Sequence, residues 1–348
     1  MYLPMPTPSL ADLREAEPKL AILIPTKDRP DLLRRQLCYY AQFQFPHSIY
    51  LLDSSQATSA ERNQQTVHSL AGKLHIVYEH DQGLTGEQAF VRLGMLAQEP
   101  YVASTGDDDL FIPRALQSAV DFLDAHPDYG SAHGFRLKLW TSTEHAHTRI
   151  LRCGSFHVWE DASSSARERL LNMVEHFWEP CCAVMRRDIY RRATLPTAAL
   201  SNTALIGFLF YTLIVMQAKS KKLDILYHVF NSHMPGRPGF LELVLTPKGL
   251  PQLVQVHNIL TEELMRLDGL PHGEASNISH QAWKRYLDLL YARRCSASCG
   301  IARFTTGWIL GRIGSRVSRS RRRCQVFGVG GVLRRGWRAW CGSCRRWG

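Results

Sequence analysis

Short apolar runs alternate with helix-period segments in the N-terminal half of the chain, and this alternation restricts the fold more than any other feature. Leu20–Ile24 is apolar without interruption, and Pro25 follows it. Such a run is typical of a strand buried on both faces of a parallel sheet. Ile49–Asp53, Leu74–Tyr78 and Tyr101–Ser104 are further predicted strands. Strands and helices in this order predict repeated βαβ units in an open, mostly parallel sheet.

The segments between these runs carry helix signals. Pro30 suits the first turn of a helix, and Leu33, Leu37 and Tyr40 then recur at helical spacing. Pro113 opens a second helix in the same way. The predicted fold class is therefore α/β, with helices flanking the sheet.

Polar residues follow three of the predicted strands, at Thr26–Arg29, Asp53–Ser55 and Asp107–Asp109. Loops at strand ends are often polar only because they are exposed to solvent, so one polar cluster alone is weak evidence for a binding site. Ligands of open α/β sheets bind beyond the carboxyl ends of the strands. Three clusters on one predicted edge indicate a site with phosphate-binding amides, an acid for a base or ribose, and a metal.

Asp107, Asp108 and Asp109 are consecutive acids at a strand end. Adjacent carboxylates repel, and each raises the pKa of its neighbour. A divalent cation offsets this repulsion, and Mg²⁺ and Mn²⁺ prefer oxygen ligands. A solvated acidic loop near the helix that begins at Pro113 is the alternative interpretation.

Three segments carry a resemblance to family 2 glycosyltransferases. Leu20–Pro30 resembles their opening, in which Pro-Thr-x-x-Arg and a helix follow an apolar strand. Ile49–Ser55 is similar to their second strand, and Tyr101–Asp109 resembles their Asp-x-Asp strand end. The resemblance covers residues 20–140 and, loosely, the next hundred. It implies a GT-A fold, which is a nucleotide-diphospho-sugar-binding domain with a Rossmann-like sheet. No Gly-x-Gly-x-x-Gly follows the first strand, which argues against a dinucleotide oxidoreductase.

The resemblance implies a nucleotide-sugar site at the first two strand ends. Pro25, Thr26 and Arg29 would line the nucleotide pocket, and Asp53 would accept hydrogen bonds from the base or ribose. A salt bridge with Asp31 at the start of the helix is the alternative role for Arg29.

The acidic triplet would hold Mn²⁺ or Mg²⁺. A leaving diphosphate gains negative charge, and a metal on its oxygens stabilises that charge. One or two protein carboxylates suffice for such an ion. We predict that Asp109 is the direct ligand and that Asp107 completes the metal motif, positioning the ribose or a metal-bound water. Asp108 belongs to the predicted nucleotide-sugar contacts.

The general base is the least defined part of the site. An inverting transferase must deprotonate the acceptor hydroxyl. The family's acid lies well downstream of the metal motif, but the comparable stretch 202–216 contains no acid. Glu179 and Glu175, on either side of Trp178, are the predicted substitutes. His133 is a further candidate, with a buried, satisfied histidine as the alternative.

These motifs predict metal-dependent transfer of a sugar from a nucleotide-diphosphate sugar to an acceptor hydroxyl, in polysaccharide or glycoconjugate synthesis. The acceptor would be a glycan or a lipid-linked molecule. One alternative is a non-catalytic relative that binds the nucleotide sugar but lacks the base. Another is a protein that binds anionic surfaces through an arginine-rich tail.

The C-terminal part differs in composition. Residues 315–348 contain ten arginines and no Asp, Glu or Lys, so removing them reduces the net charge from +11 to +1. A nearly neutral body predicts no specific nucleic-acid partner. We predict an extension at 1–18, the GT-A domain at 19–239, a helical region at 240–300 and a disordered basic tail at 301–348.

The predicted location is the cytoplasm, because residues 1–19 do not resemble a signal peptide. The apolar stretch Thr203–Met216 is shorter than the roughly 20 residues of a membrane span, so a buried helix is predicted. Peripheral contact of this stretch with the inner face of a membrane is the alternative.

Overall fold

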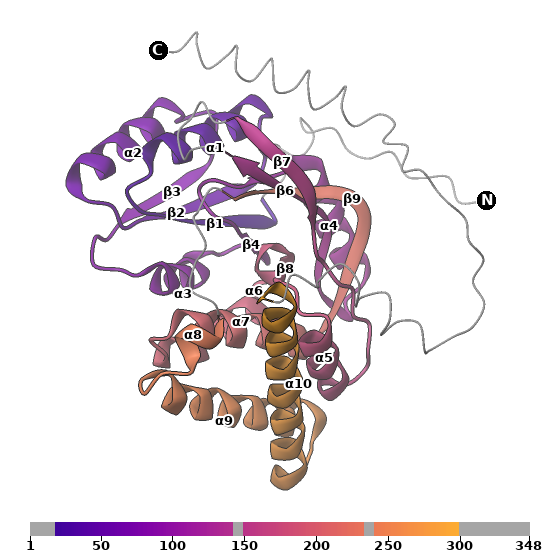
Figure 1. The fold of residues 1–348 in the computed structure, drawn as a ribbon. Helices are drawn as coiled ribbons and strands as arrows, with labels where there is room; N and C mark the ends of the chain where they lie inside the picture. Colours follow the sequence, from indigo (N-terminus) through magenta and orange to yellow (C-terminus); the bar gives the residue numbers. More distant parts are fainter. Residues whose placement is uncertain (1–17, 142–148, 233–239, 299–348) are drawn as a thin grey trace, which may run out of the picture. The chain divides into compact units, whose positions relative to one another are not determined.

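The computed structural model describes residues 18–141, 149–232 and 240–298 (Figure 1). The chain divides into two compact units, Met1–Leu289 and Leu290–Gly348. The candidate site described below belongs to the first unit. The predicted disordered tail lies outside the described residues, and the predicted domain boundaries stay predictions.

One mixed sheet runs through the described residues in the order β3-β2-β1-β4-β8-β6-β9-β5, and β7 pairs with β6. Its strands are β1 (Leu20–Thr26), β2 (Ser48–Asp53), β3 (Ile76–His80), β4 (Tyr101–Ser104), β5 (Leu110–Phe111), β6 (Tyr129–Thr141), β7 (Ile150–Phe156), β8 (Val184–Arg186) and β9 (Lys219–Ser232).

The first four strands form the predicted parallel part. β1 pairs in parallel with β2 and with β4, and β2 pairs in parallel with β3. Every residue of β2 and β4 is buried, as the apolar runs predict. β3 begins at Ile76, two residues later than predicted, and is only half-buried because it lies at the edge of the sheet. The parallel order brings the carboxyl ends of β1, β2 and β4 to one edge.

Beyond β4 the sheet becomes mixed. β8 is antiparallel to both β4 and β6, and β5 is antiparallel to β9. The long strands β6 and β9 run parallel to each other, and β7 folds back on β6 as a hairpin partner. Pairings between strands this distant in the sequence leave no short local pattern that would predict them.

Ten α-helices are described (Figure 1). They are α1 (Pro30–Gln42), α2 (Ala57–Ser69), α3 (Gly86–Leu96), α4 (Pro113–Ala125), α5 (Ala166–Glu175), α6 (Arg187–Thr194), α7 (Thr203–Gln217), α8 (Phe240–Val244), α9 (Gly249–Asp268) and α10 (His272–Ser298). Of these, α3 and α4 pack on the sheet, whereas α9 packs on other helices.

Proline occupies the first turn of α1 and of α4, as predicted. Leu33 and Leu37 of α1 pack with Leu20, Ile22 and Ile24 in one core. α9 and α10 confirm the predicted helical extension.

The apolar helix α7 is buried, as predicted. Nine of its fifteen residues are buried, and it packs against α5, α6 and α9. None of the helices in the described ranges combines the length and the apolar character that a membrane span requires.

Candidate functional site

The loop after β1 is held against the loop after β2. Asp28 adopts a left-handed backbone conformation, with φ of 55°, which aspartate tolerates better than most residues. Its backbone N–H donates to Ser55 Oγ at 2.7 Å, and its Oδ1 accepts from the backbone N–H of Gln56 at 2.9 Å. These two bonds fix the relative positions of the first two predicted polar clusters.

The acidic loop after β4 contacts the same β1 loop. Thr26 Oγ1 donates to Asp107 Oδ2 at 2.6 Å. The Arg29 guanidinium lies 2.5 Å from Asp107 Oδ1 and 3.1 Å from Asp108 Oδ2. Asp31, the alternative partner considered for Arg29, forms an ion pair with Arg62. The structure thus brings together the predicted site residues at the ends of β1 and β4.

Two polar side chains of α1 hold the acidic loop, residues 106–109, by hydrogen bonds to its backbone. Gln36 is fully buried, and its Nε2 donates to the carbonyl oxygens of Gly106 and Asp109 at 2.7 and 2.8 Å. Arg35 Nη2 donates to the carbonyl oxygen of Asp108 at 3.0 Å. The sequence reasoning missed both residues, although buried polar groups on a core-facing helix side are a usable signal.

Asp109 points toward β9. Its Oδ1 accepts from the backbone N–H of Asn231 at 2.8 Å, and its Oδ2 lies 3.9 Å from His228 Nε2. His228 Nε2 is also 3.2 Å from Thr105 Oγ1. Burial lowers the pKa of His228 well below its usual range, so this imidazole is neutral and does not neutralise Asp109. Burial raises the pKa of Asp109 well above its usual range.

Asp107 is also buried, and burial raises its pKa to about 7 although Arg29 opposes the shift. Burial thus makes both carboxyl groups harder to ionise than an exposed aspartate, and a nearby cation would favour their charged forms. No group of three or more His, Cys, Asp or Glu side chains in the described ranges could hold a metal by itself. Mg²⁺ and Mn²⁺ need only one or two carboxylates when phosphate oxygens complete the shell, so Asp107 and Asp109 fit such an ion only together with a phosphate ligand.

Asp53 is fully buried and internally satisfied. Its Oδ2 accepts from Asn63 Nδ2 and from Tyr78 Oη, both at 2.8 Å, and its Oδ1 accepts from the backbone N–H of Ser55 at 2.9 Å. Because Asp53 is fully buried, a base or ribose could reach it only if neighbouring side chains moved. Pro25, the remaining predicted pocket residue, is half-buried in β1 beside Leu52 of β2.

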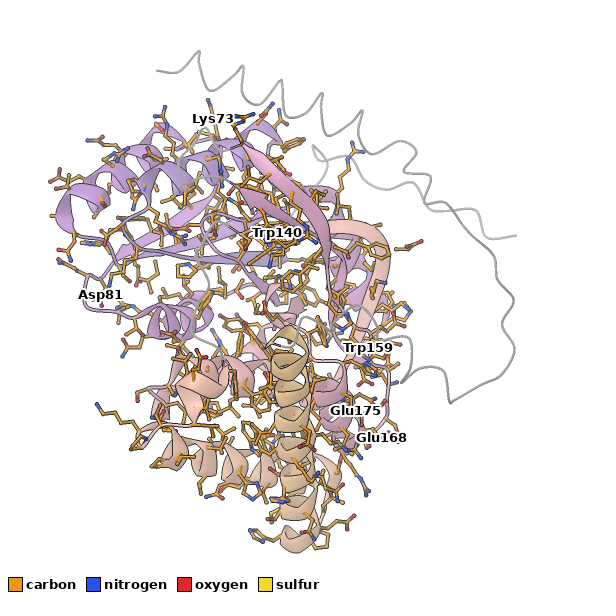
Figure 2. All side chains as sticks on the ribbon, viewed as in Figure 1. Lys73, Asp81, Trp140, Trp159, Glu168 and Glu175 are labelled. Carbon is orange, nitrogen blue, oxygen red and sulfur yellow. The ribbon has the colours of Figure 1, made fainter. Side chains whose placement is uncertain are left out.

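The two predicted general bases lie in different surroundings. Glu175 is exposed in α5 and forms an ion pair with Arg285 of α10 (Figure 2). Glu179 is half-buried, and its carbonyl oxygen accepts from Arg136 Nη1 at 3.0 Å. Arg136 also interacts electrostatically with Asp109, so Glu179 is connected to the acidic loop through a buried cation. The sequence reasoning did not identify Arg136.

His133 is a buried histidine of β6. Its Nε2 lies 3.1 Å from the carbonyl oxygen of Trp159, and its ring packs on Trp178 with 4.6 Å between centroids. Burial lowers its pKa to about 4. These contacts match the alternative interpretation of a satisfied core residue.

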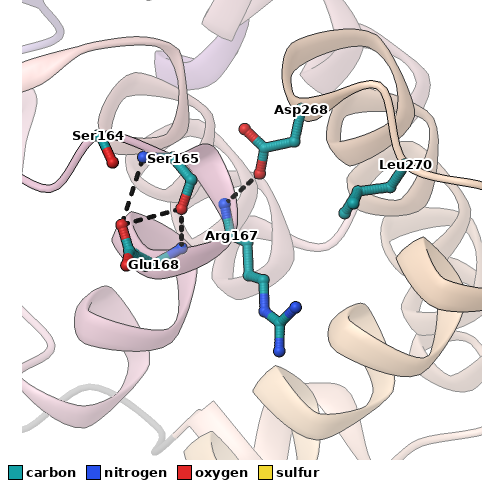
Figure 3. A pocket seen from close by; sticks show the side chains of 6 residues that line it. All are labelled: Ser164, Ser165, Arg167, Glu168, Asp268 and Leu270. Carbon is teal, nitrogen blue, oxygen red and sulfur yellow. Dashed lines mark hydrogen bonds between the residues drawn. The ribbon is translucent and has the colours of Figure 1, made fainter.

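An open pocket of about 640 Å³ lies at the start of α5, away from the acidic loop (Figure 3). The Asp268 carboxylate already accepts from the backbone N–H groups of Ala166 and Arg167 at 2.8 and 2.7 Å. The first amides of α5 are thus satisfied within the chain, and the pocket contains none of the predicted site residues.

Comparisons with known proteins agree with this geometry at the level of the fold. No family model and no curated protein matches the chain. The structure of S. aureus TarS 1-349 in complex with UDP-GlcNAc matches with a TM-score of 0.51 and 14% identity, covering 81% of this chain and 76% of that one.

Two further structures are less similar. A longer TarS structure has a TM-score of 0.49 and 15% identity, covering 77% of this chain, and this chain spans only 43% of it. The mannosyltransferase PcManGT from Pyrobaculum calidifontis, in complex with GDP-Man and Mn²⁺, has a TM-score of 0.41 and 15% identity, covering 84% of this chain and 82% of that one. We draw nothing from these two weaker likenesses.

The chain has the GT-A fold of nucleotide-sugar glycosyltransferases, which confirms the predicted fold class. The polar loops at its strand ends lie at the edge where ligands of open α/β sheets bind.

Proposed function

We propose that the protein transfers a sugar from a nucleotide-diphosphate sugar to an acceptor hydroxyl with the help of Mn²⁺ or Mg²⁺. The observation that carries this proposal is the contact between two strand-end loops. Thr26 and Arg29 after β1 meet Asp107 and Asp108 after β4, on a GT-A fold. Cationic, hydroxyl and carboxylate groups therefore converge where a metal-bound diphosphate would need them.

Asp109 and Asp107 are the residues that would hold the metal. When bound, the ion supplies positive charge that stabilises the departing diphosphate. Asp109 Oδ2 is the better placed oxygen, because its neighbour His228 is neutral and 3.9 Å away. Arg29 adds a second positive charge at the same edge, and its planar guanidinium suits phosphate oxygens.

For the acceptor hydroxyl, Glu179 is the base that we favour over Glu175. Glu175 is held in an ion pair with Arg285 on the surface. Glu179 is half-buried, and Arg136, which interacts with both Glu179 and Asp109, connects it to the acidic loop. A general base must lie within reach of the reacting hydroxyl. Because Glu179 is connected to the acidic loop in the described residues and Glu175 is not, we favour Glu179.

A protein that binds the nucleotide sugar without turnover is the second candidate. It is favoured by one observation: α7 contains no acid, and the residue that caps it, Asn202, is not an acid either. The two candidates differ in a single measurement, because only the first releases nucleoside diphosphate when an acceptor is present.

Donor binding is tested by thermal unfolding of the full chain with UDP-GlcNAc, UDP-glucose and GDP-mannose, each with and without Mn²⁺. A ligand that binds only the folded state raises its stability, by about 2.7 kcal/mol at one hundred times the dissociation constant. We expect at least one donor to stabilise the protein only when Mn²⁺ is present.

Asp109→Asn should remove this Mn²⁺-dependent stabilisation. Asp31→Asn is the matched control, because Asp31 is an exposed acid paired with Arg62. Unchanged unfolding temperatures with all three donors, in the presence and absence of the metal, would overturn the proposal.

A further inference from the structure

A cationic and aromatic face covers the outer part of the β6–β7–β9 ribbon. Arg136, Lys138 and Trp140 alternate along β6 and therefore share one face. Arg136 pairs across the sheet with Phe156, Trp140 with Arg152, and Lys138 with Phe230. We call these six residues the ribbon face. None of the described residues of β6 and β7 is an acid, and the acid of β9, Asp224, lies six residues before Phe230.

Contacts between these side chains order the face. Lys138 Nζ lies 4.9 Å from the ring centroid of Trp140 and 5.4 Å from that of Phe230. Arg152 lies 4.7 Å from the Trp140 centroid. The Trp140 ring covers Gly154, where an added Cβ would lie 3.2 Å from it. Trp140 thus holds two cations in place on a half-exposed surface (Figure 2).

The inner end of the ribbon face reaches the candidate site. Arg136 is buried over Phe156 at 4.2 Å and bonds to the carbonyl oxygen of Glu179. His228, its partner in register on β9, lies 3.9 Å from Asp109. The face is therefore continuous from the proposed metal and base to Lys138, Trp140 and Arg152 at its outer end.

We propose that the ribbon face binds the acceptor and that this acceptor is an anionic glycan, an inference that rests on the proposed function. Lys138 and Arg152 would pair with its negative groups, and Trp140 would cover the apolar side of a sugar ring. The two cations at the outer end of the face, Lys138 and Arg152, favour negatively charged partners over neutral ones. The strands would align the anionic glycan so that its acceptor end lies toward Glu179.

The test uses the full chain with fluorescently labelled dextran sulfate and with neutral dextran of the same length, without donor or metal. Binding is followed by anisotropy. The double variant Lys138→Glu with Arg152→Glu should weaken dextran sulfate binding by about tenfold or more. Arg345→Glu with Arg346→Glu changes the net charge equally in the basic tail, and we expect less than about a threefold effect. Lys138→Gln with Arg152→Gln repeats the test if the first variant fails to fold.

Hydrogen exchange locates the bound probe. We expect dextran sulfate to protect the amides of residues 136–141 and 150–156, and 1 M salt to remove this protection because it screens exposed charges. Equal effects of both double variants without protection of the ribbon would overturn the proposal, since the tail would then account for binding. Equal binding of neutral dextran, or tighter binding of oligothymidylate of equal charge to the same strands, would also overturn it.

The outcome is separable from that of the proposed function. The probe assay contains no nucleotide sugar, so a failed donor test leaves its result intact. A failed probe test likewise leaves metal-dependent donor binding standing.

Discussion

Arg29 Nη2 lies 2.5 Å from Asp107 Oδ1 and thereby joins the loop after β1 to the loop after β4. Asp107 is fully buried, whereas about a third of the Arg29 side chain, 32%, is exposed. The cation is thus accessible to a ligand from outside, while the acid that it pairs with is not. This asymmetry makes Arg29 the member of the pair that could exchange partners on binding the diphosphate of the proposed donor.

Arg29→Ala should lower the free energy of unfolding by about 1–3 kcal/mol, because it leaves the buried Asp107 carboxyl without its cation. Urea unfolding monitored by circular dichroism measures the change. Arg29→Lys should restore most of the stability but less of the donor affinity, since an ammonium cannot bind bidentately. Equal donor affinity of the alanine variant and the parent protein would contradict a role for Arg29 in donor binding.

Stability should depend on pH through Asp107. Burial raises its folded-state pKa from 3.8 to about 7, so the folded state binds this proton more tightly than the unfolded chain does. The contribution of Asp107 to stability is therefore largest below about pH 4 and decreases as the pH rises to about 7. Asp107→Asn should remove this decrease. Parallel slopes for variant and parent between pH 4.5 and 7.5 would show that Asp107 is ionised throughout.

Gln36→Ala should lower the free energy of unfolding by about 2–4 kcal/mol, because two carbonyl oxygens of the acidic loop lose their donor and a cavity remains. Gln42→Ala, at an exposed position of the same helix, is the control and should change stability little. Hydrogen exchange of residues 105–110 should rise only in the Gln36 variant. Unchanged exchange there would mean that the loop does not depend on α1.

Gly106→Ala should disturb the site more than the fold. An added Cβ would lie 2.7 Å from Asp108 Oδ1, so the Asp108 carboxylate would have to rotate and its contact with Arg29 would weaken. We expect less than about 1 kcal/mol of destabilisation but weaker donor binding. Gly134→Ala provides the contrast, because its Cβ would meet the backbone oxygen of Ile225 at 2.4 Å. Equal loss of stability in both variants would refute this distinction.

Glu179→Gln should reduce the turnover number by about 10²–10⁴-fold if Glu179 removes the acceptor proton. The Michaelis constant of the variant for the donor should change little, because the substitution preserves the side-chain size and the bond from Arg136 to the backbone carbonyl oxygen of residue 179. Glu175→Gln is the matched control and should retain nearly full activity. A larger loss of activity in the Glu175 variant would show that Glu179 is not the general base.

The sequence predicted the parallel part of the fold because its evidence is local. Leu20–Ile24 is buried along its length, and Pro30 and Pro113 begin helices as expected. The contact of Arg29 with the acidic triplet also follows from parallel order, which brings strand ends to one edge. Pairings of distant strands, such as β6 with β9, leave no comparable local pattern.

The supporting residues of the site were harder to predict. Gln36 contacts the acidic loop from the buried side of α1, and Arg136 reaches Glu179 from β6, so neither residue belongs to a sequence motif of the site. Asp53 shows the opposite case. Its position at a strand end was predicted correctly. Its hydrogen bonds from Asn63 and Tyr78 could not be predicted, because only the folded chain brings these two side chains to it.

Asp268 accepts the first two amides of α5 from a position about a hundred residues downstream in the chain. Any shortened form of the protein made for crystallisation would therefore have to retain the last turn of α9. A truncation that ends earlier would expose two unbonded donors at the helix that precedes Glu179, and inactivity of such a fragment would say nothing about the activity of the intact protein.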